Sequence, residues 1–418
     1  MLHLTKKQII LALLVINLLF TSGMTFAFWA SSISGNSGNN DGLINIGDWG
    51  TPIFTPSEFY TFATKTNSLA TDNYYIANDI DFTGFTWTYN ATNNAVTFRG
   101  TLNGNGKTLS NLTITNTSTS YLYNGIFPRL NGATIHDLTL ENINTITTLT
   151  GTSQRSGLIA GNAWGGTNTL TNITIIDSGS QGNSTNGVGG LIGNVQNSTT
   201  ILNLNNIKAT NLRVFNRSAY VGGLVGRIST SGARVTMNDV DFQGQVYAYT
   251  SSGYSGGLIG YTPSGSYFTL NRAIVEATFQ NTLVTNATYY LRYSDRYLGG
   301  IIGYNAAAAA NVKLTDVFFT GSLFNQTNTY RAAVGTVSGR DATQATLLRT
   351  YHSYVAYRTA TGTVSYTQTG QTGQMATVVS ATAMPTSVWW DGFYVNLVAG
   401  NTDWMQTPVT GRPYLNRA

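Results

Sequence analysis

The stretch Gly189-Gly190-Leu191-Ile192-Gly193 decides the fold, because it returns along the chain with few changes. Close copies read SGLIA at 156–160, GGLVG at 222–226, GGLIG at 256–260 and GGIIG at 299–303, and looser copies surround Gly125 and Ala333. The glycine before the aliphatic pair falls at 125, 157, 190, 223, 257 and 300, with Ala333 in the last place, so the steps are 32, 33, 33, 34, 43 and 33 residues. Such a regular period is typical of a solenoid.

A second motif follows each glycine by ten to fourteen residues. Its copies are IHDL at 135–138, LTNI at 170–173, LNNI at 204–207, MNDV at 237–240, LNRA at 270–273 and LTDV at 314–317. Apolar and polar residues alternate around these copies, which is the period of a strand and not of a helix. One repeat therefore reads as two or three short strands joined by tight turns.

Strands of this kind need the next copy as a hydrogen-bonding partner, so the copies stack in parallel and rise by about 4.8 Å per turn. Because crossovers between parallel strands are right-handed, the sequence predicts an all-β, right-handed parallel β-helix. Leu158, Leu191, Leu224, Leu258 and Ile301 should form one internal column. The side chains expected to line a turn, where Asn and Asp tolerate unusual dihedral angles, are Asn172, Asn206, Asp239 and Asp316. The paired glycines suit a sharp corner or a close backbone approach.

Two further stretches, YYIANDIDF at 74–82 and FRGTLNGNGKTLSNLTI at 98–114, join these repeats in a pattern that resembles a known family. With the GGLIG and GGLVG copies they resemble bacterial surface proteins with GLUG repeats. The resemblance spans about residues 55–340. It implies a pectate-lyase-like right-handed β-helix and a secreted, adhesin-like or other surface module, in a family that also includes pieces of larger enzymes.

The two ends of the chain differ from the repeats. Lys6 and Lys7 precede an apolar run and a small-residue triplet that ends at Ala27, which predicts a signal peptide or membrane anchor over 1–27 and a secreted or cell-surface location. Residues 28–54 read as a linker or early coil, 55–350 as the β-helix and 351–418 as a C-terminal arm with an aromatic cap. The motif TPSE at 55–58 has the form of a capping box and predicts a short helix that covers the first coil.

The amino-acid composition limits which classes of binding partner are expected. Only 9% of residues are charged, no Cys is present and the formal net charge is +5. Nucleic-acid binding needs a dense basic patch, but only six Lys occur, two of them in the leader, so no nucleic-acid partner is expected. Glycans or cell-surface polymers are the expected ligands, membrane contact is expected only through an uncleaved leader, and self-association is an open alternative.

The step of 43 residues contains an insertion rich in Tyr and Arg. Insertions in solenoids form loops on one face, often the binding face. The predicted ligand-binding residues, which could stack on sugar rings and pair with anionic groups, are Tyr289, Tyr290, Arg292, Tyr293, Arg296 and Tyr297. The alternative is a longer strand pair whose tyrosines pack on the outside of the β-helix.

Catalysis has few candidates. Asp79 with Asp81, and Asp239 with Asp241, lie two residues apart and so on one face of a strand, but bonding within turns and ladders explains them. The His residues lack a metal-ligand or triad pattern, so neither a metal nor a cofactor is expected. The sequence therefore favours a non-catalytic binding protein. A polysaccharide lyase or hydrolase and a structural subunit of a surface layer or filament are the alternatives.

Overall fold

The computed structural model describes residues 50–65, 72–89, 96–117, 122–148, 153–183, 185–248, 253–278, 297–324, 333–358, 364–365 and 373–416. The predicted leader, residues 1–27, lies outside the described residues, as does most of the predicted linker. The described residues belong to one compact unit, 49–418.

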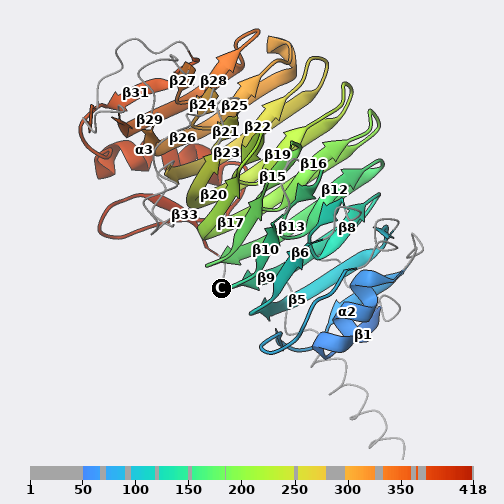
Figure 1. Ribbon diagram of the computed structural model, residues 1–418. Helices are drawn as coiled ribbons and strands as arrows, with labels where there is room; N and C mark the ends of the chain where they lie inside the picture. The colour runs from blue at the N-terminus through green and yellow to red at the C-terminus, as the bar shows by residue number, and fades with distance from the viewer. Residues whose placement is uncertain are drawn as a thin grey trace, which may run out of the picture. The chain divides into compact units, whose positions relative to one another are not determined.

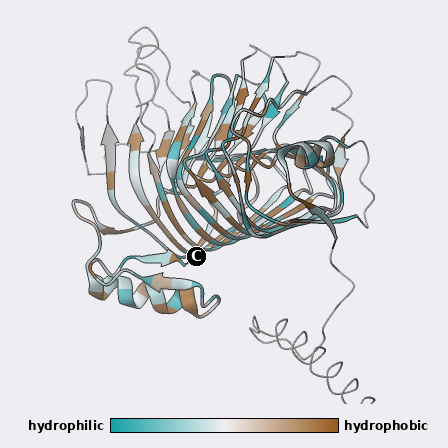
Figure 2. Ribbon diagram, turned by 90° about the horizontal axis from the view of Figure 1, so that it is seen from below, coloured by the Kyte–Doolittle hydropathy of each residue, from teal (hydrophilic) through white to brown (hydrophobic). Residues whose placement is uncertain are grey.

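That unit is a β-solenoid of about seven turns, with parallel strands stacked around an apolar core (Figures 1 and 2). The predicted parallel β-helix is thus confirmed. Among the described residues, antiparallel strand pairs form where β29 (Thr346–Arg358) meets β30 (Val364–Ser365) and where β32 (Trp404–Gln406) meets β33 (Pro413–Leu415), and Ser338 and Gln374 form an isolated antiparallel bridge.

Three sheets run the length of the stack. The first sheet contains β1 (Thr51–Ile53), β2 (Asn73–Ile76), β3 (Ile80–Asp81), β5 (Thr101–Ser110), β6 (Thr113–Asn116), β9 (Thr134–Glu141), β10 (Asn144–Thr147), β13 (Thr167–Ile176), β14 (Gly179–Gly182), β17 (Ile201–Asn216), β20 (Arg234–Ala248), β23 (Tyr267–Thr278), β26 (Val312–Phe324), β29 (Thr346–Arg358), β30 (Val364–Ser365) and β31 (Thr377–Ser380). The second sheet contains β7 (Tyr123–Asn124), β11 (Arg155–Ser156), β15 (Gly187–Gly189), β18 (Tyr220–Gly222), β21 (Tyr254–Gly256), β24 (Tyr297–Gly299) and β27 (Ala333–Gly335). The third sheet contains β4 (Thr97–Phe98), β8 (Phe127–Leu130), β12 (Ala160–Trp164), β16 (Ile192–Gln196), β19 (Val225–Ile228), β22 (Ile259–Thr262), β25 (Ile302–Asn305) and β28 (Ser338–Asp341).

Leu191, Leu224, Leu258 and Ile301 form the predicted internal column and are fully buried. The backbone N–H of each donates to a carbonyl of the next turn at 2.9–3.0 Å, so the column is fixed by the same bonds that stack the turns. The phase predicted for Leu158 is wrong by one residue: Ala160 pairs with Ile192, so the buried Leu158 lies beside Gly190 and Ile159 takes the place in the column.

The glycines of the repeat allow the second and third sheets to approach each other closely. A Cβ on Gly256 would lie 1.9 Å from the carbonyl oxygen of Ile259 and 2.5 Å from the backbone nitrogen of Gly303. A Cβ on Gly257 would lie 1.9 Å from the carbonyl oxygen of Gly300, in the next turn. At Gly256 and Gly257 backbone therefore meets backbone, and a side chain at either position would require the neighbouring turn to shift.

The Asn and Asp residues line a turn, as predicted. Asn172, Asn206, Asp239 and Asp316 all have φ between 54° and 58°, the left-handed region that Asn and Asp tolerate best. Their side chains also bond along the stack: Asn172 Nδ2 donates to Asp137 Oδ1 at 2.6 Å, and Asn206 Nδ2 donates to Asn172 Oδ1 at 3.1 Å. The turn is therefore held both by its dihedral angles and by its neighbours above and below.

The phase predicted for the last copy is wrong. Ala333 pairs with Tyr297, and Gly335 pairs with Gly299, so Ala333 does not take the place of Gly300. That place belongs to Thr336, because Ile301 N donates to the carbonyl of Val337. Residues 335–339, GTVSG, are the true copy, and their substituted residues hide the motif in the sequence.

The predicted N-terminal helix is confirmed as α2 (Pro56–Thr64). Glu58 N donates to Thr55 Oγ1 at 3.2 Å and Thr55 N donates to Glu58 Oε2 at 3.1 Å, which completes the capping box. Phe59 and Phe62 on its inner face are buried, and the ring centroids of Phe62 and Phe127 are 5.5 Å apart. The helix therefore closes the apolar core at the first turns.

The aromatic cap at the other end includes a helix that was not predicted, α3 (Ser387–Val398). Trp390, Phe393 and Leu397 are buried, but Val388 and Val395 are exposed, so the apolar residues do not form the single stripe that predicts a helix. The cap packs on Ile274 of β23 and Phe318 of β26 and so covers the outer side of the last coils (Figure 2).

Adding one methyl group at the glycine seam should be costly. We expect Gly256→Ala to lower the free energy of unfolding by about 3 kcal/mol or more, because its Cβ meets backbone that belongs to two turns. Thermal unfolding followed by circular dichroism measures the change. Gly392→Ala in α3, where a Cβ meets nothing within 4 Å, is the control and should be neutral or stabilising by up to about 1 kcal/mol. Equal effects at both positions would contradict the seam.

Acid should destabilise the fold through His352. Its ring lies on the inner face of β29, opposite Phe319, and burial lowers its pKa to about 4 from the ordinary 6.5. The unfolded chain binds the proton first, so this contribution is complete above about pH 6.5 and is lost as the pH falls toward 4, a total of about 3 kcal/mol. Urea unfolding between pH 4 and 7 should show a shallower pH dependence in His352→Leu than in the native protein. Identical slopes would exclude a buried neutral His352.

Candidate ligand-binding surface

Most of the predicted binding residues cannot be placed. Tyr289, Tyr290, Arg292, Tyr293 and Arg296 lie outside the described residues. Tyr297 is described: it begins β24 and is 7% exposed. The structure thus shows where the predicted insertion rejoins the β-helix, and the residues around Tyr297 define the candidate surface.

Tyr297 belongs to a row of aromatic and basic side chains that flanks the glycine seam. We call this row the Tyr–Arg strip; its members are Tyr123, Arg155, Tyr220, Tyr254 and Tyr297 on the second sheet and Arg129, Arg227, Tyr261, Tyr304 and Arg340 on the third. The register links them along the stack: Tyr220 pairs with Tyr254 and Tyr254 with Tyr297, while Tyr304 pairs with both Tyr261 and Arg340. The strip therefore follows the axis of the solenoid.

The tyrosine rings of the two sheets pack on one another across the seam. The Tyr220 and Tyr261 centroids are 5.2 Å apart and those of Tyr254 and Tyr304 are 5.3 Å apart, while Tyr297 lies 5.1 Å from Tyr304. Aromatic pairs at such distances stabilise one another beyond the burial of their area. Burial and the neighbouring tyrosines raise the pKa of Tyr261. The arginines of the strip therefore lie against rings that are held in place by their neighbours.

Each arginine of the strip lies over a ring. Arg227 Cζ is 4.8 Å from the centroid of Tyr220, Arg155 Cζ is 5.2 Å from that of Tyr123, and Arg340 Cζ is 5.0 Å from that of Tyr297. Arg129 lies between Tyr123 and Trp164, at 5.5 and 5.8 Å. A ring face attracts a cation but carries no net charge to neutralise it.

No carboxylate in the described part of the chain forms an ion pair with these arginines. Burial lowers the pKa of Arg155 and of Arg227, and the Arg227 charge lowers that of Arg155 further. The Nε atoms of Arg129, Arg155 and Arg227 are buried without a hydrogen-bond partner in the described structure. In the part of the chain that the structure describes, Arg129, Arg155 and Arg227 are thus partly buried cations without a carboxylate counter-ion, whereas Arg340 is exposed.

The acidic pairs considered for catalysis are engaged in the fold. Asp79 accepts a hydrogen bond from Thr108 N at 2.8 Å, and Asp81 accepts one from Thr83 N at 2.9 Å. Asp81 also accepts from Asn111 Nδ2, and its hydrogen bonds lower its pKa. Both carboxylates therefore stabilise turns of the first coil through hydrogen bonds.

The second pair anchors the C-terminal segment. Asp239 accepts two hydrogen bonds from Arg272, at 2.7 and 2.9 Å, and a third from Trp404 Nε1 at 2.8 Å. Asp241 accepts from Leu415 N at 3.2 Å and faces Arg412, 3.7 Å away. Burial raises the pKa of Asp241, and the Arg412 charge opposes that rise. Arg412 Nη2 also lies 3.5 Å from Glu276 Oε2, so these carboxylates take part in the contacts that hold the C-terminal segment.

The described ranges can be compared with the requirements of a metal site, of histidine chemistry and of a membrane-spanning helix. They contain no group of three or more His, Asp or Glu side chains placed to hold a metal ion. His136 Nδ1 contacts Asp137 Oδ2 at 2.7 Å within the turn ladder, while His352 is buried in the core. The described helices include none that is long and apolar enough to cross a membrane.

Comparison with known proteins identifies the fold but no family. No family model matches the chain, and no curated protein matches it. A solved structure described as a "putative immunoglobulin A1 protease" from Bacteroides ovatus is similar, with a TM-score of 0.53 over 88% of this chain and 94% of that chain. At 15% identity this likeness shows a shared β-solenoid fold alone. The GLUG-repeat family is not shown by these comparisons.

The sequence contained a signal for the strip that the predictions missed. Its residues stand two before or one after the repeated motif, as in Tyr220-Val221-GGLVG-Arg227 and Tyr254-Ser255-GGLIG-Tyr261. In a stack, equivalent positions form one column, so these flanking residues must lie in line. The insertion drew attention because of its length, whereas the strip depends on side chains that recur at a fixed phase.

Removing Asp239 should cost stability, because its loss leaves Arg272 and Trp404 Nε1 without their acceptor. We expect Asp239→Ala to lower the free energy of unfolding by about 3–5 kcal/mol and to expose Trp404 on denaturation at lower urea concentration. Tryptophan fluorescence measures both. Asp391→Ala, which removes an exposed carboxylate from α3, should change stability by less than about 0.5 kcal/mol. An unaffected Asp239→Ala protein would contradict the anchoring role.

Proposed function

We propose that this protein is a non-catalytic binding protein of the cell exterior and that its Tyr–Arg strip holds an anionic glycan. The observation that supports the proposal most directly is that Arg129, Arg155 and Arg227 are half-buried on aromatic rings and form no ion pair with a carboxylate among the described residues. The secreted location rests on the predicted leader, residues 1–27, and stays a prediction.

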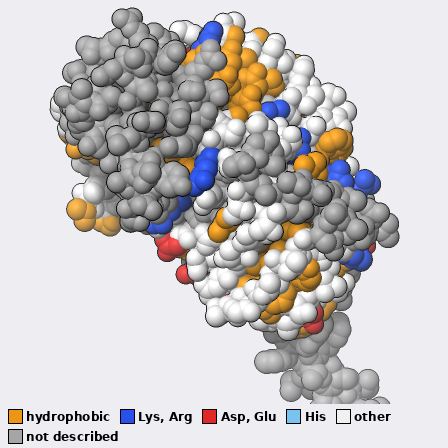
Figure 3. Space-filling model, in the orientation of Figure 1, with side chains coloured by type: hydrophobic (Ala, Val, Ile, Leu, Met, Phe, Trp, Pro, Cys, Tyr) orange, Lys and Arg blue, Asp and Glu red, His pale blue; other side chains and the backbone are white. Residues whose placement is uncertain are grey.

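Electrostatics favours an anionic ligand. Partly buried cations without counter-ions destabilise the empty protein, and a bound anion would relieve that cost. Arginine presents a planar set of donors that matches carboxylate and sulfate groups, and the ring beneath holds that plane in place. On the described part of the face drawn in Figure 3, Lys and Arg atoms are more prominent than Asp and Glu atoms, which favours an anionic ligand over a cationic one.

The shape of the strip favours a polymer. It runs from Arg129 on β8 to Arg340 on β28, a span of seven successive strands of the third sheet, so it extends over roughly 30 Å at about 4.8 Å per strand. A single small anion would engage one or two of its arginines, whereas an extended polysaccharide could reach those at both ends. Repeated weak contacts along one chain add up to useful affinity.

A glycan is favoured over a single-stranded nucleic acid. Proteins bind single strands by stacking bases on free aromatic faces. In the strip, the tyrosines pack on one another or lie under arginines, so few faces are free for bases. The predicted contacts from the insertion, Tyr289 to Tyr297, would extend the same surface beyond β24.

Charge removal in the strip should weaken glycan binding. We expect immobilised polygalacturonate and dextran sulfate to bind the protein, and neutral dextran not to bind. Arg155→Gln with Arg227→Gln should raise Kd at least about tenfold, since each charged hydrogen bond contributes about 1–3 kcal/mol. Biolayer interferometry at fixed salt measures the change.

Arg213→Gln with Arg217→Gln removes the same charge from two exposed positions, one within β17 and one directly after it, and should leave Kd within about twofold. In the same assay, Tyr290→Ala, Arg292→Ala and Tyr293→Ala together test the insertion. If the strip and control variants lose the same amount of affinity, the binding is general charge attraction and the assignment to the strip is wrong. Tighter binding of oligothymidylate than of either polysaccharide would overturn the glycan proposal in favour of nucleic acid.

A further inference from the structure

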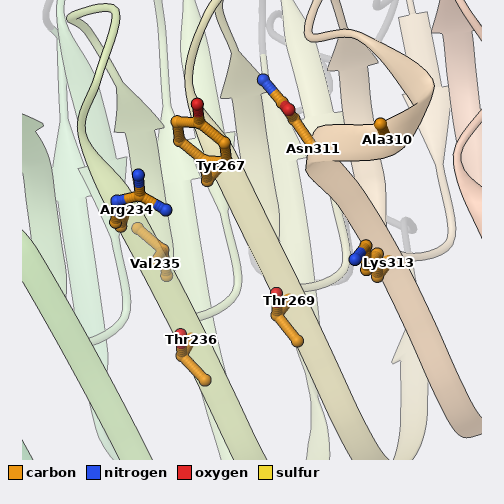
Figure 4. A pocket seen from close by; sticks show the side chains of 8 residues that line it. All are labelled: Arg234, Val235, Thr236, Tyr267, Thr269, Ala310, Asn311 and Lys313. Carbon is orange, nitrogen blue, oxygen red and sulfur yellow. The ribbon is translucent and has the colours of Figure 1, made fainter.

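A separate groove lies on the outer face of the first sheet, across β20, β23 and β26 (Figure 4). It has a volume of about 270 Å³ and is lined by Arg234, Val235, Thr236, Tyr267, Thr269, Ala310, Asn311 and Lys313. None of these residues belongs to the Tyr–Arg strip, which occupies the other two sheets. The 3-10 helix η4 (Ala309–Asn311) forms one wall, so the groove exists only where this short helix precedes β26.

The groove collects hydrogen-bond donors and two cations but no acid. Arg234 and Lys313 supply positive charge, Asn311 supplies an amide, and Thr236 and Thr269 supply hydroxyls. Neither Arg234 nor Lys313 forms an ion pair within the described part of the chain. The local charge of the lining is therefore +2.

The register fixes these groups relative to one another. Arg234 pairs with Tyr267 on the neighbouring strand, and Thr236, Thr269 and Lys313 stand in one row across three strands. Arg234 Cζ lies 3.9 Å from the centroid of Tyr267, so the guanidinium is stacked on the ring. A cation held in this way loses little conformational freedom when a ligand binds.

The geometry points to a binding site for one anionic sugar unit, bearing a carboxylate or a sulfate. The anionic group would lie against Arg234 or Lys313, which line opposite sides of the groove in Figure 4, and the ring hydroxyls would bond to Thr236, Thr269 and Asn311. A volume just below the roughly 300–1,000 Å³ of drug-sized sites suits a monosaccharide better than a bare inorganic ion. The site does not depend on the Tyr–Arg strip.

Saturation-transfer NMR with galacturonate, galactose 6-sulfate and galactose tests the site. We expect saturation transfer to at least one of the two acidic sugars and little to galactose. Arg234→Gln with Lys313→Gln should reduce the effect at least tenfold, and Arg234→Lys should retain part of it. Arg213→Gln with Arg217→Gln is the charge-matched control and should leave it unchanged.

Two further arms separate this site from the strip and from simple anion binding. Arg155→Gln with Arg227→Gln should leave the monosaccharide signal intact, while Arg234→Gln with Lys313→Gln should change polygalacturonate affinity less than threefold. Thermal unfolding checks that every variant folds. The assignment is overturned if the Arg234/Lys313 variant binds as well as the native protein, if galactose binds equally, or if equimolar inorganic sulfate displaces the acidic sugar fully.

Discussion

Hydrogen bonding between successive turns is the constraint on which the whole structure depends. Each turn gives its backbone donors and acceptors to the next, so every turn must follow nearly the same path. Residues that bend the path are therefore repeated: glycine where Gly256 and Gly257 meet backbone, and Asn or Asp where φ is positive, as at Asn172 and Asp239. Residues that point outward do not shape the path and can differ from turn to turn.

That division explains where binding chemistry can arise in this protein. The inner columns are occupied by Leu, Ile and Val, whereas the outer columns change from Arg155 to Tyr220 and Tyr254 along a single row. Both surfaces proposed for ligands are built from such outer columns, with cations fixed on rings at 4.8 Å in the strip and 3.9 Å in the groove. A solenoid can thus place binding groups at regular spacing without changing its core.

The sequence was sufficient for the parts of the fold that repeat. The internal column from Leu191 to Ile301, the turn ladder through Asn206 and the capping box at Thr55 all followed from spacing and residue type, whereas Leu158 was assigned one residue out of phase. The last copy was misplaced because Thr336 and Ser338 stand where glycine and an aliphatic residue were sought. Helix α3 was missed because its apolar residues form no single stripe. The strip and the groove arise from contacts between turns, and a contact such as that of Arg234 with Tyr267 appears only when the register is known.

The C-terminal segment has a consequence for how the molecule comes apart. Linear arrays tend to fray from their ends, one unit after another, because each unit touches only its neighbours. Here Asp403 receives a hydrogen bond from Asn206 on β17, Trp404 bonds to Asp239 on β20, and α3 packs on Phe318 of β26. The C-terminal segment thus contacts strands from β17 to β26, which belong to several turns. Unfolding from the C-terminal end must first break these contacts. The turns from β17 to β26 are consequently expected to unfold together.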